Sequence, residues 1–177
     1  MTSQPHCQIT SLTSRILAVG LLVMLSSAGI AAAAPPPQNG AAAPAFSLSL
    51  AANGRGSVSL RQLHGHAVYI NFFATWCQPC KAEAPAIAHL AQEFAKHNVV
   101  VLGIDELETE SAARGFALQY RLPYPIAVDG GGDVGGNYGL IGLPLHVFVG
   151  ADGRVVMHRE GEMTPAQIRA ELLKIGR

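Results

Sequence analysis

The sequence has little charge, few aromatic residues and almost no cysteine. Charged residues make up 14% of its 177 residues, and twelve basic and twelve acidic side chains give a formal net charge of zero. Because no basic cluster is present, the chain lacks an electrostatic footprint for nucleic acid, which we do not expect as a partner. Two of the three cysteines share one short motif, so a framework of disulfides between distant loops is also excluded.

Motifs for phosphate and for zinc are also missing. The glycine-dense stretch 129–139 has no Gly-Lys-Ser/Thr, and because we expect it to be a loop, its glycines do not stand in the strand-to-helix context of a phosphate-binding Gly-x-Gly-x-x-Gly. No second Cys or His pair at ligand spacing accompanies Cys77 and Cys80, so a tetrahedral zinc site would lack half of its ligands. We therefore expect no metal.

The first 34 residues have the pattern of an export signal. Residues 1–15 carry one formal charge, Arg15, and no acid, and an apolar stretch follows that ends in alanines. We predict that 1–34 is a secretory signal peptide cut after Ala33, and that Cys7 is lost with it. An uncleaved membrane anchor is the alternative, because the apolar run is nearly long enough to span a bilayer. In both cases the working domain lies outside the cytoplasm.

The remainder divides into a linker and one domain. Residues 35–44 are rich in proline and alanine, which favours an extended linker. Residues 45–177 have the length of a single ordinary domain with room for a core.

The most informative segment is Trp76-Cys77-Gln78-Pro79-Cys80-Lys81, which follows the apolar, strand-like run 68–73. The motif opens a predicted helix, whose first N–H groups lack partners and whose dipole is positive at this end. Both effects favour a thiolate, so Cys77 is the expected nucleophile, and Cys80 is within reach to resolve a mixed disulfide. Pro79 removes an N–H that a helix start leaves unpaired anyway. This arrangement suits dithiol–disulfide chemistry.

Hydrophobic periodicity predicts a chain in which strands and helices alternate. Asp105 to Glu110 is interpreted as an acidic turn, and Thr164 with Gln167 predicts a capping box at the last helix. The strand–helix–strand unit around the cysteines implies parallel pairing through a right-handed crossover. The predicted strands are 46–50, 57–60, 68–73, 99–104, 145–149 and 154–158, and the predicted helices are 78–97 with a stop at Asn98, 111–120, and one starting at Pro165.

These features together resemble the thioredoxin superfamily, and more narrowly the extracytoplasmic TlpA/ResA-type thiol–disulfide oxidoreductases. The resemblance covers about 46–176 and implies an α/β, thioredoxin-like fold, a central mixed β-sheet flanked by helices. Residues 105–129 match the insertion that is typical of the TlpA/ResA type. The segments that carry the resemblance are 60–65, 71–85, 142–144 and 161–164.

The resemblance implies roles for further residues. The proline that matches Pro144 has a cis peptide bond beside the disulfide, and Leu143 would offer its backbone to a partner polypeptide. Asn71 stands where cytoplasmic thioredoxins carry a buried acid, and Glu83 is the candidate substitute as proton acceptor from Cys80. Trp76 flanks a thiol that we expect to be exposed, which makes it a predicted partner contact.

The implied activity is that of a periplasmic thiol–disulfide oxidoreductase. We expect it to reduce protein disulfides, with apocytochrome c as one substrate and a membrane dithiol as electron donor. The redox-active Cys77–Cys80 disulfide would be its only redox group, with no other cofactor. The Gln-Pro spacer does not decide between a reductant and an oxidant.

A copper-binding or metallochaperone protein on the same fold is the alternative. It would use Cys77, Cys80 and His146, since such proteins combine two cysteines with a later histidine. Their cysteines are typically spaced Cys-x-x-x-Cys, which this chain lacks. In the main interpretation His146 simply lies on a strand face, in Pro144-Leu145-His146 where the family often has Pro-Thr-Thr.

Overall fold

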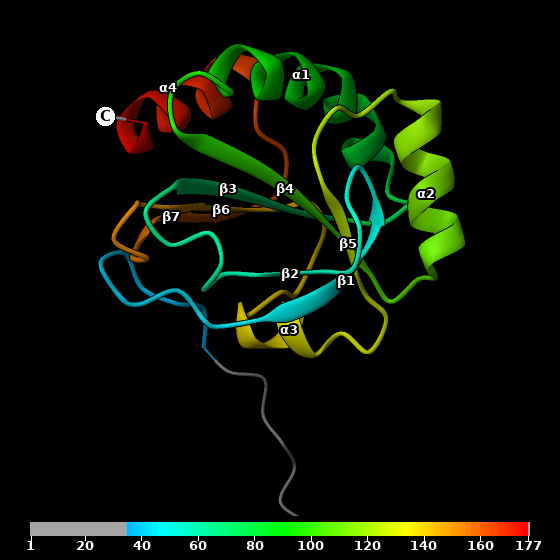
Figure 1. Ribbon diagram of the computed structural model, residues 1–177, viewed down its shortest axis with the longest axis horizontal. Helices are drawn as coiled ribbons and strands as arrows, with labels where there is room; N and C mark the ends of the chain where they lie inside the picture. The colour runs from blue at the N-terminus through cyan, green and yellow to red at the C-terminus, as the bar shows by residue number, and fades with distance from the viewer. Residues whose placement is uncertain (1–34, 177) are drawn as a thin grey trace, which may run out of the picture. The chain divides into compact units, whose positions relative to one another are not determined.

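The computed structural model describes residues 35–176, so the predicted signal peptide or anchor lies outside the described residues. Within this range, seven strands form one mixed sheet in the order β2-β1-β5-β4-β3-β6-β7 (Figure 1). No helix in this range combines the length and apolar character needed to cross a membrane. The strands are β1 (Ser47–Ala52), β2 (Ser57–Ser59), β3 (Ala67–Phe73), β4 (Val99–Glu106), β5 (Ile126–Asp129), β6 (Leu145–Val149) and β7 (Val155–Glu160). The helices are α1 (Gln78–Phe94), α2 (Glu110–Gln119), α3 (Asp133–Asn137) and α4 (Pro165–Ile175).

The sheet topology confirms the predicted fold class. β3 and β4 are parallel, and α1 connects them in sequence, as the strand–helix–strand pattern requires. β6 pairs antiparallel with both β3 and β7, so the two strands predicted at 145–149 and 154–158 form a hairpin. The structure therefore has the expected α/β architecture, with a central mixed sheet flanked by helices.

Two apolar layers cover the sheet. One contains buried residues of α1, α2 and α4, and includes both Cys77 and Cys80. The other contains Val134 of α3 and Tyr138, packed against the opposite side chains of β3, β4 and β6. Figure 1 shows α1 and α4 on one face and α3 on the other. The predicted capping box is present at α4, where Thr164 accepts from the backbone N–H of Gln167.

The structure differs from the prediction most clearly in three segments. β4 continues to Glu106, so the first residues of the expected acidic turn are buried strand residues. The expected glycine-rich loop contains the end of β5 and the short helix α3. α1 ends at Phe94, and Asn98 instead adopts a left-handed φ of 56° before β4. Tertiary pairing overrides local propensity in these segments, because β5 is held by β4 on one side and β1 on the other.

Part of the predicted linker pairs with the β7 hairpin. The backbone N–H of Gly40 donates to the carbonyl of Val155 at 2.7 Å, and that of Ala43 donates to Gly153 at 2.9 Å. An isolated bridge joins Ala42 to Arg154. The chain just before the domain is therefore fixed to the edge of the sheet.

A pair of buried carboxyl groups links β4, β5 and α3. Glu106 and Asp129 are paired across the two strands, and both are buried. Asp129 Oδ2 accepts from the backbone N–H groups of Val134 and Gly135 at 2.8 Å. Burial, followed by the charge of Asp129, raises the pKa of Glu106 to about 8. Glu106 is thus protonated in the folded protein at neutral pH.

The raised pKa of Glu106 predicts a fall in stability as pH rises. An unfolded glutamate titrates near pH ~4, so the stability that this group contributes is complete below that pH. That contribution is lost progressively as pH rises toward about 8, the folded pKa. Glu106→Gln should give a shallower decline of the unfolding free energy between pH 4 and 8, measured by urea titration. Exposed Glu110→Gln is the control, and wild-type-like pH dependence in Glu106→Gln would contradict the prediction.

Candidate active site

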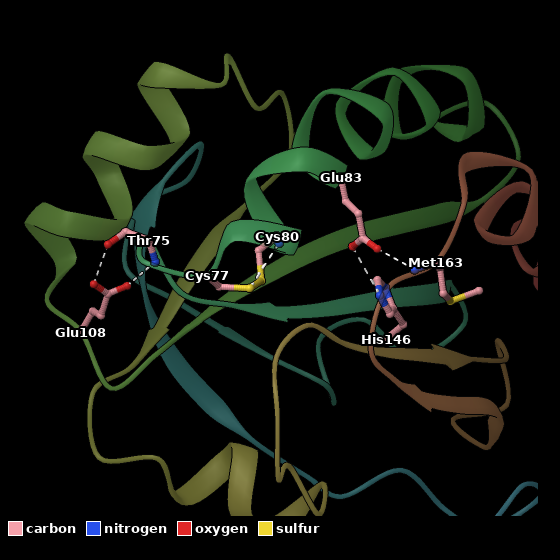
Figure 2. The surroundings of a disulfide bond; sticks show 7 residues. All are labelled: Thr75, Cys77, Cys80, Glu83, Glu108, His146 and Met163. Carbon is pink, nitrogen blue, oxygen red and sulfur yellow. Dashed lines mark hydrogen bonds and ion pairs between the residues drawn. A yellow bond between two sulfur atoms is a disulfide. The ribbon is translucent and has the colours of Figure 1, made fainter.

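The two cysteines lie at the start of α1. Cys77 is the N-cap residue, and its Sγ accepts from the backbone N–H of Cys80 at 3.2 Å. The pair forms a disulfide with an S–S distance of 2.02 Å and a Cα–Cα distance of 5.3 Å (Figure 2). Pro79 occupies the second helical position, where its missing N–H removes no intrahelical hydrogen bond. A thiolate at Cys77 would face the positive end of the helix.

The disulfide is less accessible than the sequence suggested. Cys77 and Cys80 are 3% and 4% exposed, so the expectation of an exposed thiol is wrong for the oxidised protein. Both cysteines pack in the apolar layer that includes the buried residues of α1, α2 and α4, which accounts for their burial. Trp76 is 66% exposed beside them, in a position where it can touch a partner.

The chain before β6 provides the second part of the site. The Leu143–Pro144 peptide bond is cis, as the resemblance implied. Pro144 is buried, and half-buried Leu143 packs against both apolar layers, including the one that holds the cysteines. Leu143 therefore lies beside the apolar layer that contains the disulfide, directly after exposed Ile141 and Gly142.

A carboxylate holds the turn that leads to the cysteines. Glu108, just beyond β4, accepts from the backbone N–H of Thr75 at 2.5 Å and from its hydroxyl at 2.6 Å (Figure 2). Asp105 is completely buried nearby, and burial together with Glu108 raises its pKa to about 8. The contact fixes Thr75 two residues before Cys77, and sequence analysis did not predict it because it joins two distant segments.

Glu83 is a buried carboxyl group one helical turn after Cys80. Its side chain lies on the same side of α1 as Cys80, is 8% exposed, and accepts from the backbone N–H of Met163 at 2.6 Å through Oε1. Burial raises the pKa of Glu83 to about 7, the Met163 hydrogen bond opposes that rise, and the charge of Glu162 adds to it. A carboxyl group with such a pKa can both accept and release a proton near neutral pH.

A cavity gives Glu83 a path to solvent. The cavity has a volume of about 280 Å³ and is lined by Glu83, Pro79 and Met163, among others. A proton accepted by Glu83 can leave through this opening without crossing the protein core.

His146 meets Glu83 from the opposite side. His146 is in β6, is fully buried, and its Nδ1 lies 2.8 Å from the hydroxyl oxygen of Tyr69. Its Nε2 is 3.4 Å from Glu83 Oε2 (Figure 2). Burial lowers the pKa of His146 to about 4, a weaker opposing influence comes from the nearby Gly161 backbone, which does not meet hydrogen-bond geometry with Nε2, and Arg159 lowers the pKa further. The ring is therefore neutral at pH 7. The sequence placed His146 on a strand face but showed neither of these contacts.

These contacts do not favour the copper alternative. Both ring nitrogens of His146 face other side chains, Tyr69 and Glu83, and not the cysteines. Between residues 35 and 176, no group of three or more His, Cys, Asp or Glu side chains is arranged to hold a metal ion.

The fold and the cysteine pair define a thioredoxin-like protein, and comparison with known proteins specifies the family. Residues 39–158 match the AhpC/TSA family. The thiol-disulfide oxidoreductase ResA of Bacillus thuringiensis subsp. konkukian is 36% identical over 118 residues, 67% of this chain and 68% of the relative. ResA of Bacillus subtilis is 32% identical over 129 residues, 73% of this chain and 71% of the relative.

Solved structures agree with this assignment. A thiol:disulfide interchange protein of the thioredoxin family from Chlorobium tepidum superposes with a TM-score of 0.68 at 25% identity, covering 81% of this chain and 99% of that one. The chain belongs to the AhpC/TSA family of the thioredoxin superfamily, within its ResA-type branch. It is a thiol-disulfide oxidoreductase of the thioredoxin type.

Proposed function

We propose that this protein is a periplasmic reductase of protein disulfides in which Cys77 is the nucleophile. The observation that carries the proposal is the position of Cys77 at the N-cap of α1, with the Cys80 N–H directed at its sulfur. In the reduced protein, that N–H and the helix dipole favour the Cys77 thiolate over the thiol.

The proposed reaction transfers two electrons to the substrate. The Cys77 thiolate attacks one sulfur of a substrate disulfide, which forms a mixed disulfide and releases the first substrate thiolate. The Cys80 thiolate then attacks the Cys77 sulfur, which re-forms the Cys77–Cys80 disulfide and releases the second substrate thiolate. Both substrate thiolates take up protons, and a membrane dithiol restores the Cys77–Cys80 dithiol while it is itself oxidised.

Glu83 is the proposed proton acceptor from Cys80. The Cys80 thiol must lose its proton before it can resolve the mixed disulfide, and buried Cys80 has little direct contact with water. Glu83 lies one turn away on the same side of α1, with a pKa near 7 and a cavity beside it. It can take the proton from Cys80 and pass it to solvent.

Trp76, Pro79, Leu143 and Pro144 are proposed to frame the partner. An extended polypeptide could pair with the backbone of Leu143 while its side chains contact exposed Trp76. Apocytochrome c, with its Cys-x-x-Cys-His disulfide, is the proposed natural substrate, and a membrane dithiol is the proposed donor. The location rests on the predicted signal peptide at 1–34.

The substrate proposal is tested with a synthetic Cys-x-x-Cys-His peptide disulfide. The reduced protein should reduce this peptide with a one-to-one stoichiometry, at least about tenfold faster than it reduces glutathione disulfide, because the peptide backbone can pair with Leu143. Equal rates with both disulfides would contradict a polypeptide-binding role for this site.

The proposed location is tested separately with a fusion protein. Alkaline phosphatase fused after residue 44 should be active only if the first 34 residues direct export.

A further inference from the structure

His146 lies in a chain of polar contacts that ends at Glu83, and no step of the proposed reaction uses His146 or Tyr69. The chain runs from Tyr69 on β3 through His146 on β6 to Glu83 on α1, with all three side chains buried. The two contacts are 2.8 Å, from the Tyr69 hydroxyl to Nδ1, and 3.4 Å, from Nε2 to Glu83 Oε2. A buried polar ring is costly unless its nitrogens find partners, so the orientation of this ring is fixed by them.

The contacts of Tyr69 and Glu83 together select which ring nitrogen carries the proton. Burial raises the pKa of Tyr69 well above its ordinary value, so its hydroxyl stays protonated and can donate to Nδ1, and an ionised Glu83 carboxylate facing Nε2 can only accept. A neutral histidine that accepts at Nδ1 must carry its proton on Nε2. The Nε2–H then faces the Oε2 of Glu83, while Oε1 of the same carboxyl group accepts from Met163.

We infer that His146 is a positioning residue for Glu83, whose Nε2–H, fixed by Tyr69, donates to Glu83 Oε2 and stabilises the carboxylate that accepts the Cys80 proton. This inference rests on the proposed role of Glu83. The separation of 3.4 Å in the oxidised protein is long for a hydrogen bond, and neither Oε2 nor Nε2 has another side-chain or backbone partner that meets hydrogen-bond geometry. We expect the contact to shorten when Glu83 ionises, as catalytic hydrogen bonds do in the reacting state.

The charged and titratable groups around His146 and Glu83 favour a neutral His146 ring as the hydrogen-bond donor. The positive charge of Arg159, the cross-strand neighbour of His146 on β7, disfavours a positive charge on the His146 ring. Glu162, in the turn after β7, favours a protonated Glu83. His146 and Met163 therefore favour the ionised form of Glu83, whereas burial and Glu162 favour its protonated form. The balance keeps Glu83 able to ionise near neutral pH.

The test measures the pKa of Glu83 directly in the reduced full-length protein. The ¹³C signal of the Glu83 carboxyl carbon is followed against pH, and its absence in Glu83→Gln assigns it. His146→Phe keeps a ring of similar size but has no donor, so we expect the Glu83 pKa to rise by about one unit. With a wild-type pKa of about 7, disulfide reduction at pH 7 should then be about fivefold slower.

Three variants separate positioning from a general structural effect. His146→Gln retains an N–H donor and should restore most of the wild-type pKa. His158→Gln is the matched control, because His158 lies on the opposite face of the same hairpin and bonds to the Tyr138 carbonyl at 2.8 Å. It should leave Glu83 unchanged. If His146→Phe does not fold, Tyr69→Phe decides, since it frees the histidine tautomer and should raise the Glu83 pKa by a smaller amount.

The outcomes distinguish this inference from the proposed function. An unchanged Glu83 pKa in His146→Phe, or in Tyr69→Phe where the first variant is unfolded, would overturn the role of His146. If Glu83→Gln leaves the rate and its pH profile unchanged, Glu83 is not the proton acceptor, whatever its pKa. A slow Glu83→Gln together with a Glu83 pKa that ignores His146 would leave the proposed function standing and remove only this inference.

Discussion

Replacing Cys77 by serine should abolish disulfide reduction. The hydroxyl of serine is not ionised at neutral pH even at a helix N-terminus, so the first attack on the substrate disulfide cannot occur. Cys80 is 4% exposed behind the N-cap residue and cannot take over the attack. The measurement is insulin reduction with dithiothreitol as electron source, where Cys77→Ser should fall to the uncatalysed rate.

Replacing Cys80 by serine should leave the first attack intact and block the resolution of the mixed disulfide. Cys77 can still attack, but nothing resolves the mixed disulfide, so a stable covalent complex should accumulate with each substrate. It should be visible as a band that disappears on reduction. In the uncleaved full-length chain, which retains Cys7, Cys7→Ser is the control cysteine variant and should keep full activity. Substantial turnover by Cys77→Ser, or a trapped complex in that variant instead of in Cys80→Ser, would contradict the assigned roles.

Replacing Glu83 by glutamine should slow the reaction and remove one ionisation from its pH profile. Glutamine keeps the shape of the side chain and can still accept from the Met163 N–H, but it cannot take a proton. General base catalysis contributes typically about 100-fold or more, and we expect a loss of about this size at pH 7. The wild-type rate should rise through the Glu83 pKa of about 7, whereas the variant should lack that limb.

A control on the same helix tests whether the loss of any negative charge from α1 changes the rate or its pH profile. Glu93 pairs with Arg169 at the other end of α1, with a nitrogen–oxygen distance of 2.5 Å. Glu93→Gln should leave the rate and the pH profile unchanged, and unfolding curves exclude a loss of folded protein as the cause in either variant. A Glu83→Gln enzyme with the wild-type pH profile would show that the proton leaves Cys80 by another path.

The sequence was sufficient to predict those parts of the site that depend on local structure. The strand before the cysteines, the helix that Cys77 caps and the capping box at Thr164 all follow from neighbouring residues, and the structure contains each of them. The fold class could also be predicted, because the strand–helix–strand unit permits few topologies. The cis bond at Pro144 could be expected only from the family resemblance.

The parts that were missed depend on contacts between distant segments. Acidic Asp105 and Glu106 indicated a turn, yet both are buried in β4, where burial raises their pKa values to about 8. The glycine-rich stretch indicated a loop, but α3 needs glycine, since a Cβ on Gly135 would lie 2.5 Å from the Glu106 carboxylate. His146 was predicted to lie on a strand face, or to bind copper in the alternative, and its contact with Glu83 was missed because that contact joins residues far apart in sequence.

The midpoint potential of the Cys77–Cys80 pair tests the central claim most directly. Trp76, the only tryptophan of the chain, adjoins Cys77 and provides a fluorescence signal for titration in dithiothreitol redox buffers. A reductase that is supplied with electrons by a membrane dithiol should have a two-electron midpoint below about −220 mV. A midpoint near about −120 mV would instead define an oxidant that introduces disulfides, and it would contradict the proposed direction of the reaction.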